Sequence, residues 1–283
     1  PVMKAVKVNC AEDAQNALAY KGKADLILFD AKAPEDRPGA LPGGILPWRR
    51  AVLLRDGVRH LETSMPADVK ICGLKTESAL EAALANGADY VGLVFHEASP
   101  RNIDFSTARK LADKARGRAK IVVLLVDPDD SRLDEVIAAA GPDVIQLHGE
   151  ETPERVAEIA QRLGLPVMKA IKVNCAEDAQ NALAYKGKAD LILFDAKAPE
   201  DRPGALPGGN GIAFDWQALE GVRGKMDYML AGGLTPLNVA EAIRMTGARA
   251  VDVSSGVEAG PGEKDPELIR RFLHAAKTAN QAP

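Results

Sequence analysis

The sequence contains few cysteines and histidines, and it lacks the motifs in which these residues form disulfide frameworks or metal sites. Cysteine occurs three times, at Cys10, Cys72 and Cys175, and no CxxC pair is present. The four histidines show none of the spacings that are typical of metal ligands. These observations argue against a disulfide-stabilised scaffold and against a metal centre.

Long apolar runs and an excess of positive charge are also missing. No run of about 18 apolar residues is present to cross a bilayer, and residues 1–20 lack the apolar stretch of a secretory signal. The formal net charge is −4 at pH 7, so little would neutralise the phosphates of a nucleic acid. We predict a cytoplasmic protein with neither a membrane nor a nucleic-acid partner.

The chain contains a nearly perfect internal duplication. Residues 1–44 repeat residues 166–209, and Val6 in place of Ile171 is the single difference. Solenoid proteins contain several divergent copies that stack on one another, so one near-identical pair indicates a recent or engineered duplication. We predict a duplicate, a linker and a complete barrel domain over residues 1–44, 45–64 and 65–283.

From residue 65 onward, short apolar runs alternate with helical patterns. The run at 120–126, KIVVLLV, is continuous and β-branched, as expected for a strand covered on both faces. Residues 76–86 have helical spacing, with Thr76 suited to cap the N-terminus. Eight strand–helix units in roughly 215 residues favour an α/β fold of the (β/α)8 barrel type over a doubly wound sheet. In such barrels the chemistry lies at the carboxyl ends of the strands.

Two candidate catalytic residues stand at the ends of predicted strands. Cys72 ends an apolar run before a glycine, and its thiolate can act as a base if nearby positive charge lowers its pKa. Asp195 follows the apolar run at 191–194, where a carboxylate is costly unless it is paired or used. The structural alternatives are a buried filler for Cys72 and a loop cap for Asp195. The functional interpretation makes Cys72 a base and Asp195 a general acid.

Turns of small residues follow the last two predicted strands. Exposed backbone N–H groups at this place in a barrel commonly hold a phosphate. We therefore predict a phosphate site from the two turns, at Gly232, Gly233, Ser254, Ser255 and Gly256.

Three further polar residues are candidates for substrate binding. Arg101 lies in the loop after the second predicted strand, where a guanidinium can bind a carboxylate. Gln146 and His148 end the fourth predicted strand. An arginine is more often a solvated charge, and a lone histidine is more often a structural group.

Seven motifs, taken in order, resemble those of the phosphoribosylanthranilate isomerases. They are VKICGLK, GLVFHEASPRNI, VIQLHGEE, ILFDAK, GGNGIAFDW, LAGGL and VDVSSGVE, and the resemblance covers residues 65–283. It implies a barrel of the ribulose-phosphate-binding type, a small sugar-phosphate substrate and no cofactor. The implied reaction, an Amadori rearrangement in tryptophan biosynthesis, converts N-(5-phosphoribosyl)anthranilate to a carboxyphenylamino deoxyribulose phosphate.

The resemblance also implies roles for single residues. Asp195 matches the general acid, which protonates the ribose ring oxygen and opens the ring to an imine. Cys72 matches the general base, which removes the proton from C2 to give an enolamine. The two small-residue turns match the phosphate site, and Arg101 matches the residue that holds the anthranilate carboxylate.

Two other interpretations stay open. The first is a related sugar-phosphate barrel isomerase of histidine biosynthesis, although that family carries aspartate at the position of Cys72. The second is a non-catalytic assembly protein that its own duplicate blocks. Asp30 is the duplicate's copy of Asp195 and a candidate acid. We predict that the in-line copy fills the barrel and that residues 1–44 promote self-association, in the form of a domain swap.

Overall fold

The computed structural model describes residues 66–196 and 214–280, together with the backbone of strands at residues 3–8, 26–31, 50–54 and 57–59. The chain divides into two compact units, Pro1–Met65 and Pro66–Pro283.

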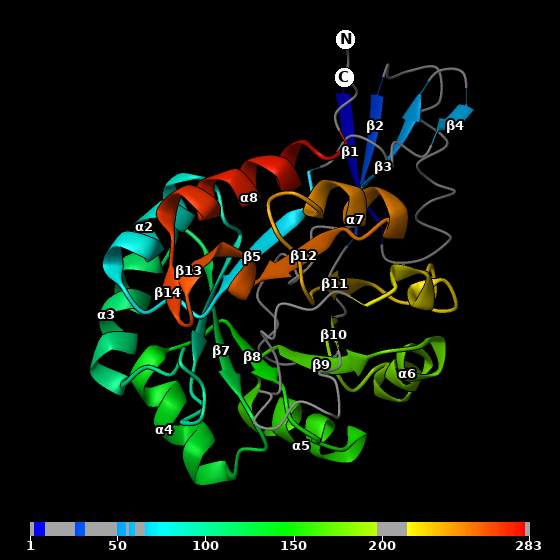
Figure 1. Ribbon diagram of the computed structural model, residues 1–283. Helices are drawn as coiled ribbons and strands as arrows, with labels where there is room; N and C mark the ends of the chain where they lie inside the picture. The colour runs from blue at the N-terminus through cyan, green and yellow to red at the C-terminus, as the bar shows by residue number, and fades with distance from the viewer. Residues whose placement is uncertain are drawn as a thin grey trace. The chain divides into compact units, whose positions relative to one another are not determined.

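Eight parallel strands of the second unit close into a barrel (Figure 1). Each strand pairs with the next along the chain, and the last pairs with the first through Asp252 and Lys70, which lie directly opposite each other. The predicted (β/α)8 barrel is therefore confirmed. The strands are β5 (Asp68–Cys72), β6 (Tyr90–Val94), β7 (Lys120–Leu125), β8 (Val144–Leu147), β9 (Val167–Val173), β10 (Leu191–Ala196), β11 (Tyr228–Leu230) and β12 (Ala250–Val253).

Helices surround the barrel, and several begin at side-chain caps that the sequence supplies. The hydroxyl of Thr76 accepts a hydrogen bond from the backbone N–H of Ala79, as predicted. Of the helices within residues 66–196 and 214–280, none has the length and apolar character that a bilayer span requires. The helices are α2 (Glu77–Ala85), α3 (Phe105–Ala115), α4 (Asp130–Ala140), α5 (Pro153–Leu163), α6 (Ala176–Asn181), η2 (Ala182–Tyr185), η3 (Trp216–Leu219), α7 (Val239–Thr246), η4 (Ser255–Val257) and α8 (Pro266–Thr278).

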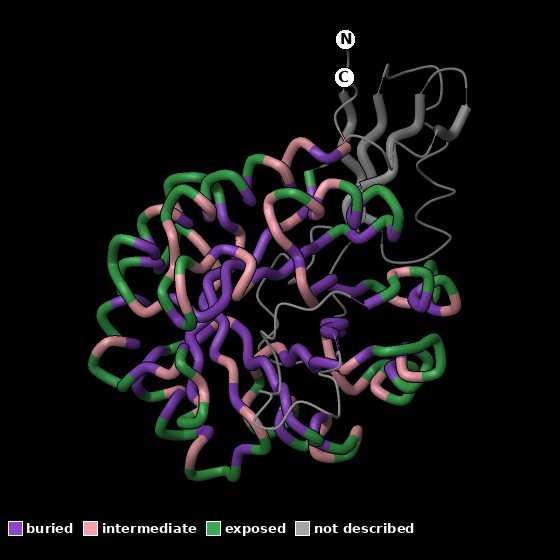
Figure 2. Tube along the Cα trace, in the orientation of Figure 1, coloured by how far each residue is buried: buried purple, intermediate pink, exposed green. Residues whose placement is uncertain are grey.

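The period of two along each strand puts one set of residues against the helices and the other set inside the barrel. Val69 and Ile71 of β5 belong to the hydrophobic core between barrel and helices, whereas the neighbouring Lys70 and Cys72 do not. Asp252 is likewise the one charged residue of β12. Figure 2 shows the barrel strands almost wholly buried and the exposed residues on the surrounding helices. The alternation therefore points the chemically active side chains into the barrel.

The first unit contains a separate four-stranded sheet in the order β1 (Met3–Val8), β2 (Leu26–Ala31), β3 (Arg50–Leu54) and β4 (Gly57–Arg59). Strands β1 and β2 are parallel, and Met3 lies opposite Leu26. The in-line copies β9 and β10 have the same register, with Met168 opposite Leu191. The two copies differ in the direction of the strand that pairs next: β3 is antiparallel to β2, whereas β11 is parallel to β10.

The in-line copy therefore supplies the fifth and sixth strands of the barrel. Strands β3 and β4 fall within residues 45–64, the range for which the sequence predicted a linker, and they pair with the duplicate's sheet. Asp30 lies in β2, and its side chain is outside the part of the chain that the structure describes.

Candidate active site

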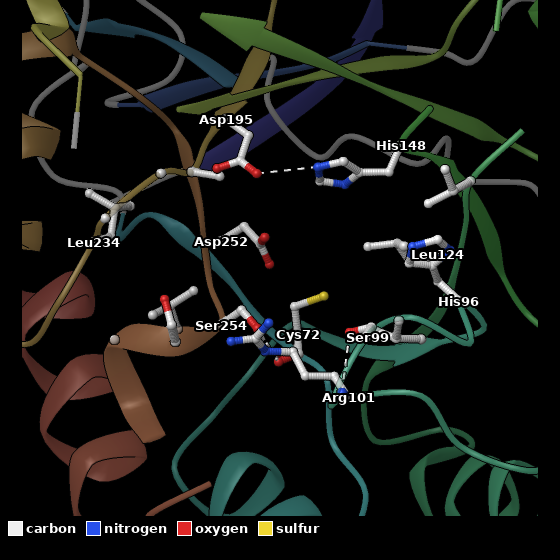
Figure 3. A pocket seen from close by; sticks show the side chains of 18 residues that line it. Cys72, His96, Ser99, Arg101, Leu124, His148, Asp195, Leu234, Asp252 and Ser254 are labelled. Carbon is white, nitrogen blue, oxygen red and sulfur yellow. Dashed lines mark hydrogen bonds and ion pairs between the residues drawn. The ribbon is translucent and has the colours of Figure 1, made fainter. Parts of the chain in front are cut away.

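A pocket opens at the carboxyl ends of the barrel strands (Figure 3). Its lining comes from strand ends and from the loops that follow them. Both predicted catalytic residues, Cys72 and Asp195, line it, as do Arg101 and His148. All five residues of the predicted phosphate turns line it too, whereas Gln146 is fully buried and does not. The barrel thus gathers side chains that are far apart in the sequence.

Cys72 is a buried free thiol at the end of β5. A Cβ atom on Gly92 of β6 would lie 3.0 Å from both the Cα and the Sγ of Cys72, so only glycine leaves room for the thiol there. On the other side, the hydroxyl of Ser254 donates to the Cys72 carbonyl at 3.2 Å. Burial raises the pKa of Cys72, and the charges of Lys70 and Lys264 counteract this only in part. The sequence made the role of base depend on nearby positive charge that lowers this pKa; both lysines lower it, but burial outweighs them.

A buried ion pair lies one layer below Cys72. The ammonium of Lys70, which is fully buried, is 2.9 Å from Oδ1 of Asp252. Burial by itself lowers the pKa of Lys70, but the charges of Asp252 and Cys72 outweigh it and raise the pKa. Asp252 also lines the pocket, and in Figure 3 its carboxylate points into the space between Asp195 and Cys72.

Asp195 ends a chain of buried polar groups. Its Oδ2 is 3.2 Å from Nε2 of His148, and Nδ1 of that ring is 2.9 Å from the amide nitrogen of Gln146. An amide nitrogen only donates, so Nδ1 accepts and the Nε2–H group of His148 donates to Asp195. The Gln146 Oε1 atom is buried without a hydrogen-bond partner. The sequence predicted Gln146 and His148 as substrate ligands. In the structure His148 contacts the candidate acid, and Gln146 contacts His148.

Arg101 is held by a carboxylate that the sequence analysis did not select. Its Nε and Nη2 atoms lie 2.8 and 2.9 Å from the two oxygens of Glu258, in the short strand β13 (Glu258–Gly260). Lys264 of β14 (Glu263–Lys264) lies 2.5 Å from the same carboxylate. Burial raises the pKa of Glu258, but Arg101 and Lys264 outweigh it and the pKa is lowered. The guanidinium is thus fixed at the edge of the pocket.

The two small-residue turns present backbone N–H groups to the pocket. Gly232 has a φ of +83°, which favours glycine, and a Cβ atom there would lie 2.5 Å from the backbone nitrogen of Ala196. A Cβ atom on Gly256 would lie 1.9 Å from the carbonyl oxygen of Leu234, so the two turns pack directly together. In the hydrogen bonds found within residues 66–196 and 214–280, the N–H groups of Gly232, Gly233, Ser255 and Gly256 have no acceptor. The turns can therefore bind an anion.

The sequence did not single out four charged residues of the site, namely Lys70, Asp252, Glu258 and Lys264. Asp252 carried the same signal as Asp195, a carboxylate at the end of an apolar strand. Lys70 carried a signal too, because a residue two positions before Cys72 on a strand shares its face. Among the described side chains, no three His, Cys, Asp or Glu residues cluster as metal ligands.

Comparison with known proteins relates residues 69–275 to the family described as N-(5'phosphoribosyl)anthranilate (PRA) isomerase. An N-(5'-phosphoribosyl)anthranilate isomerase of Parvibaculum lavamentivorans is 53% identical over 215 residues, which cover 76% of this chain and 100% of that protein. The same-named protein of Rhizobium meliloti is also 53% identical, over 76% of this chain and 99% of its own length.

Solved structures are similar over the same region. Phosphoribosyl anthranilate isomerase from Thermotoga maritima is 36% identical, with a TM-score of 0.67 over 75% of this chain and 98% of that one. A phosphoribosyl anthranilate isomerase in complex with reduced 1-(o-carboxyphenylamino)-1-deoxyribulose 5-phosphate is 34% identical, with a TM-score of 0.65 over 75% and 98%.

Proposed function

The chain belongs to the N-(5'-phosphoribosyl)anthranilate isomerase family, and we propose that Cys72 and Asp195 carry out its reaction as general base and general acid. It isomerises N-(5'-phosphoribosyl)anthranilate in tryptophan biosynthesis. The observation that supports these roles is the placement of the two groups. They lie on opposite sides of one pocket, which the two turns suited to bind a phosphate also line (Figure 3).

The reaction needs proton transfer at two different atoms of the sugar. Asp195 protonates the ribose ring oxygen, the C1–O bond breaks, and the ring opens to a protonated imine. Cys72 then takes the proton from C2, and the electron pair of that C–H bond moves toward the imine nitrogen to give an enolamine. Tautomerisation of the enolamine gives the ketone, so no atom is gained or lost. One group on each side of the sugar meets both requirements.

The substrate carries a phosphate and a carboxylate, and the pocket lining supplies a candidate partner for each. The backbone N–H groups of the two small-residue turns bind the phosphate. Arg101 binds the anthranilate carboxylate, and Glu258 holds its guanidinium in a fixed plane. We place the ribose within the same pocket, which Asp195 and Cys72 also line.

The test uses the internal duplication as its own control. Asp195→Asn and Asp30→Asn are the same substitution in the two copies. We expect Asp195→Asn to lower kcat by about 100-fold or more, the usual contribution of a general acid, and Asp30→Asn to leave kcat unchanged. Cys72→Ser should likewise lower kcat, and the same substitution at Cys175 should leave kcat unchanged. Activity that survives in the double variant Asp195→Asn with Asp30→Asn would contradict the assignment of the acid, whereas activity that is lost only in this double variant would mean that Asp30 has taken the site.

We further propose that residues 1–44 promote self-association by exchange with the in-line copy of another chain. The two copies differ at one residue and pair in the same register, so either can fit one place in a barrel. Analytical ultracentrifugation of the full chain should show a mass that rises with concentration. Asp195→Asn chains would test the exchange further, because their duplicate keeps Asp30: activity that rises with protein concentration, and that is lost when Asp30→Asn is added, would show a donated segment. A monomer at all concentrations would contradict the proposal.

The cytoplasmic location predicted from the sequence is part of the same proposal. Cys72 must remain a free thiol to act as a base, and a reducing compartment keeps it so.

A further inference from the structure

Lys70 and Cys72 lie on the same face of β5, two residues apart, so their Cα atoms are about 7 Å apart along the strand. Both side chains point into the barrel, with Cys72 at the pocket and Lys70 one layer below it. The ammonium of Lys70 is fully buried beneath the thiol. A lysine in this position is costly unless its charge is paired, and Asp252 supplies the pair at 2.9 Å.

The register of the barrel fixes this pair. Asp252 lies directly opposite Lys70 across the β5–β12 ladder. The next layer up holds Cys72, whose carbonyl accepts from the Ser254 hydroxyl. A Cβ atom on Gly92 of β6 would lie 3.0 Å from the Sγ atom of Cys72, so the glycine leaves space for the thiol. The thiol, the ammonium and the carboxylate are therefore held in fixed positions by three adjacent strands.

From this geometry we propose that Lys70 is a positioning residue for Cys72, and that its ammonium, held by Asp252, stabilises the thiolate that takes the substrate proton. The inference rests on the proposed role of Cys72 as base. A neutral thiol is a poor base, and burial disfavours the thiolate further. A cation one layer below the thiol counteracts that burial, which matches the opposing influences of burial and Lys70 on the pKa of Cys72.

Other charges act on the thiol from the neighbouring elements. Lys264 on β14 also favours the thiolate, whereas Asp252 on β12 opposes it. Lys264 is already paired with Glu258. Lys70 is the cation with the larger influence of the two on Cys72. The remaining titratable or charged groups that line the cavity are His96, Arg101, His148 and Asp195.

The barrel contains a matched control for Lys70. Lys169 of β9 is a second buried lysine, and it pairs with Glu151 at 2.8 Å. Strands β5 and β9 are four places apart in the ring of eight, so they lie on opposite sides of the barrel. A Lys169→Met change also breaks a buried ion pair, on the outer face of β9, and leaves the surroundings of Cys72 intact.

The experiment measures the reactivity of Cys72 toward iodoacetamide as a function of pH. The full chain carries Cys10→Ser and Cys175→Ser, so that only one thiol reacts. Lys70→Met should move the midpoint of alkylation to higher pH by about one unit or more and slow alkylation at pH 7 about tenfold. Lys169→Met should leave the midpoint unchanged. The acid limb of the kcat/KM profile should move to higher pH in Lys70→Met alone.

A lone Lys70→Met change can destabilise the fold, because it leaves Asp252 buried without a partner. The double change Lys70→Met with Asp252→Leu replaces both charges by apolar groups, which is often neutral for stability. It should also raise the midpoint, by a smaller amount. An unchanged or lowered midpoint in a folded variant overturns the inference. The proposed role of Cys72 fails separately, if Cys72→Ser stays active whatever the midpoint.

Discussion

Arg101 and Glu258 form a bidentate ion pair between the β6–α3 loop and β13, although they lie 157 residues apart. Lys264 and the backbone N–H of Gly262 also bind the Glu258 carboxylate. The pair closes one edge of the pocket and sets the plane of the guanidinium.

We predict that Glu258→Gln lowers kcat/KM about 10- to 100-fold, mainly through KM, because loss of one partner of a buried charge pair costs about 2 kcal/mol or more. Steady-state kinetics with phosphoribosylanthranilate would measure this, and Glu263→Gln, an exposed neighbour on the same hairpin, is the control. A lower KM in Glu258→Gln would instead mean that Glu258 competes with the substrate carboxylate for Arg101.

His148→Asn should lower kcat about tenfold and change KM little. The substitution removes a hydrogen bond to Asp195 that contributes about 1 kcal/mol, and a misplaced acid slows the chemical step rather than binding. His274→Asn, on the exposed face of α8, serves as the control. The opposite pattern, a raised KM with unchanged kcat, would support the substrate-binding role that the sequence suggested for His148.

Gly92→Ala should both destabilise the protein and impair the reaction. The new methyl group would lie 3.0 Å from the Cα and Sγ atoms of Cys72, so β5 and β6 must separate locally. Overpacking of this kind costs about 1–3 kcal/mol, measurable by urea unfolding. Gly221→Ala is the control, since its methyl group meets only the amide nitrogen of Gln180, at 3.5 Å. Equal stability of the two variants would show that the strands adjust freely.

We predict that the contribution of Asp68 to the free energy of unfolding falls as the pH rises. Burial and the neighbouring Asp89 raise the pKa of Asp68 from 3.8 to about 6. The folded state therefore binds this proton more tightly than the unfolded state, and the stability from it is present below pH 3.8 and lost as the pH rises through about 6.

Asp68→Asn should stabilise the protein by about 1–2 kcal/mol at pH 7 and flatten the pH dependence of unfolding between these values. Asp113→Asn, on the exposed face of α3, should change stability by less than about 0.5 kcal/mol. If unfolding of the Asp68→Asn protein keeps the wild-type pH dependence, Asp68 does not titrate in this range.

Much of the fold followed from local patterns. Continuous apolar runs such as 120–126 became barrel strands, and Thr76 caps α2 as its position indicated. These features depend on neighbours within a few residues, so periodicity and capping chemistry can predict them. The sequence also placed Cys72 and Asp195 at strand ends, which in a barrel share one face.

The partners of these residues could not be predicted in the same way. Lys70 and Asp252 are 182 residues apart, and His148 and Asp195 are 47 apart. Contact between them depends on closure of the barrel and on the register of β5 with β12, which no local pattern encodes. Burial of Cys72, which raises its pKa against the expectation from nearby charge, is likewise a property of the packed barrel.

The duplication shows most directly what the local sequence determines and what the tertiary structure decides. Residues 1–44 and 166–209 have the same strand-forming sequence, and in both the two strands pair in parallel with the same register. The sequence alone determined that local pairing, together with the identity of the residues at the strand ends. Which copy belongs to the barrel was decided only by tertiary structure, because β10 finds a parallel neighbour in β11 whereas β2 pairs with the antiparallel β3. The two nearly identical segments have different surroundings, because only the in-line copy belongs to the ring of strands that closes the barrel.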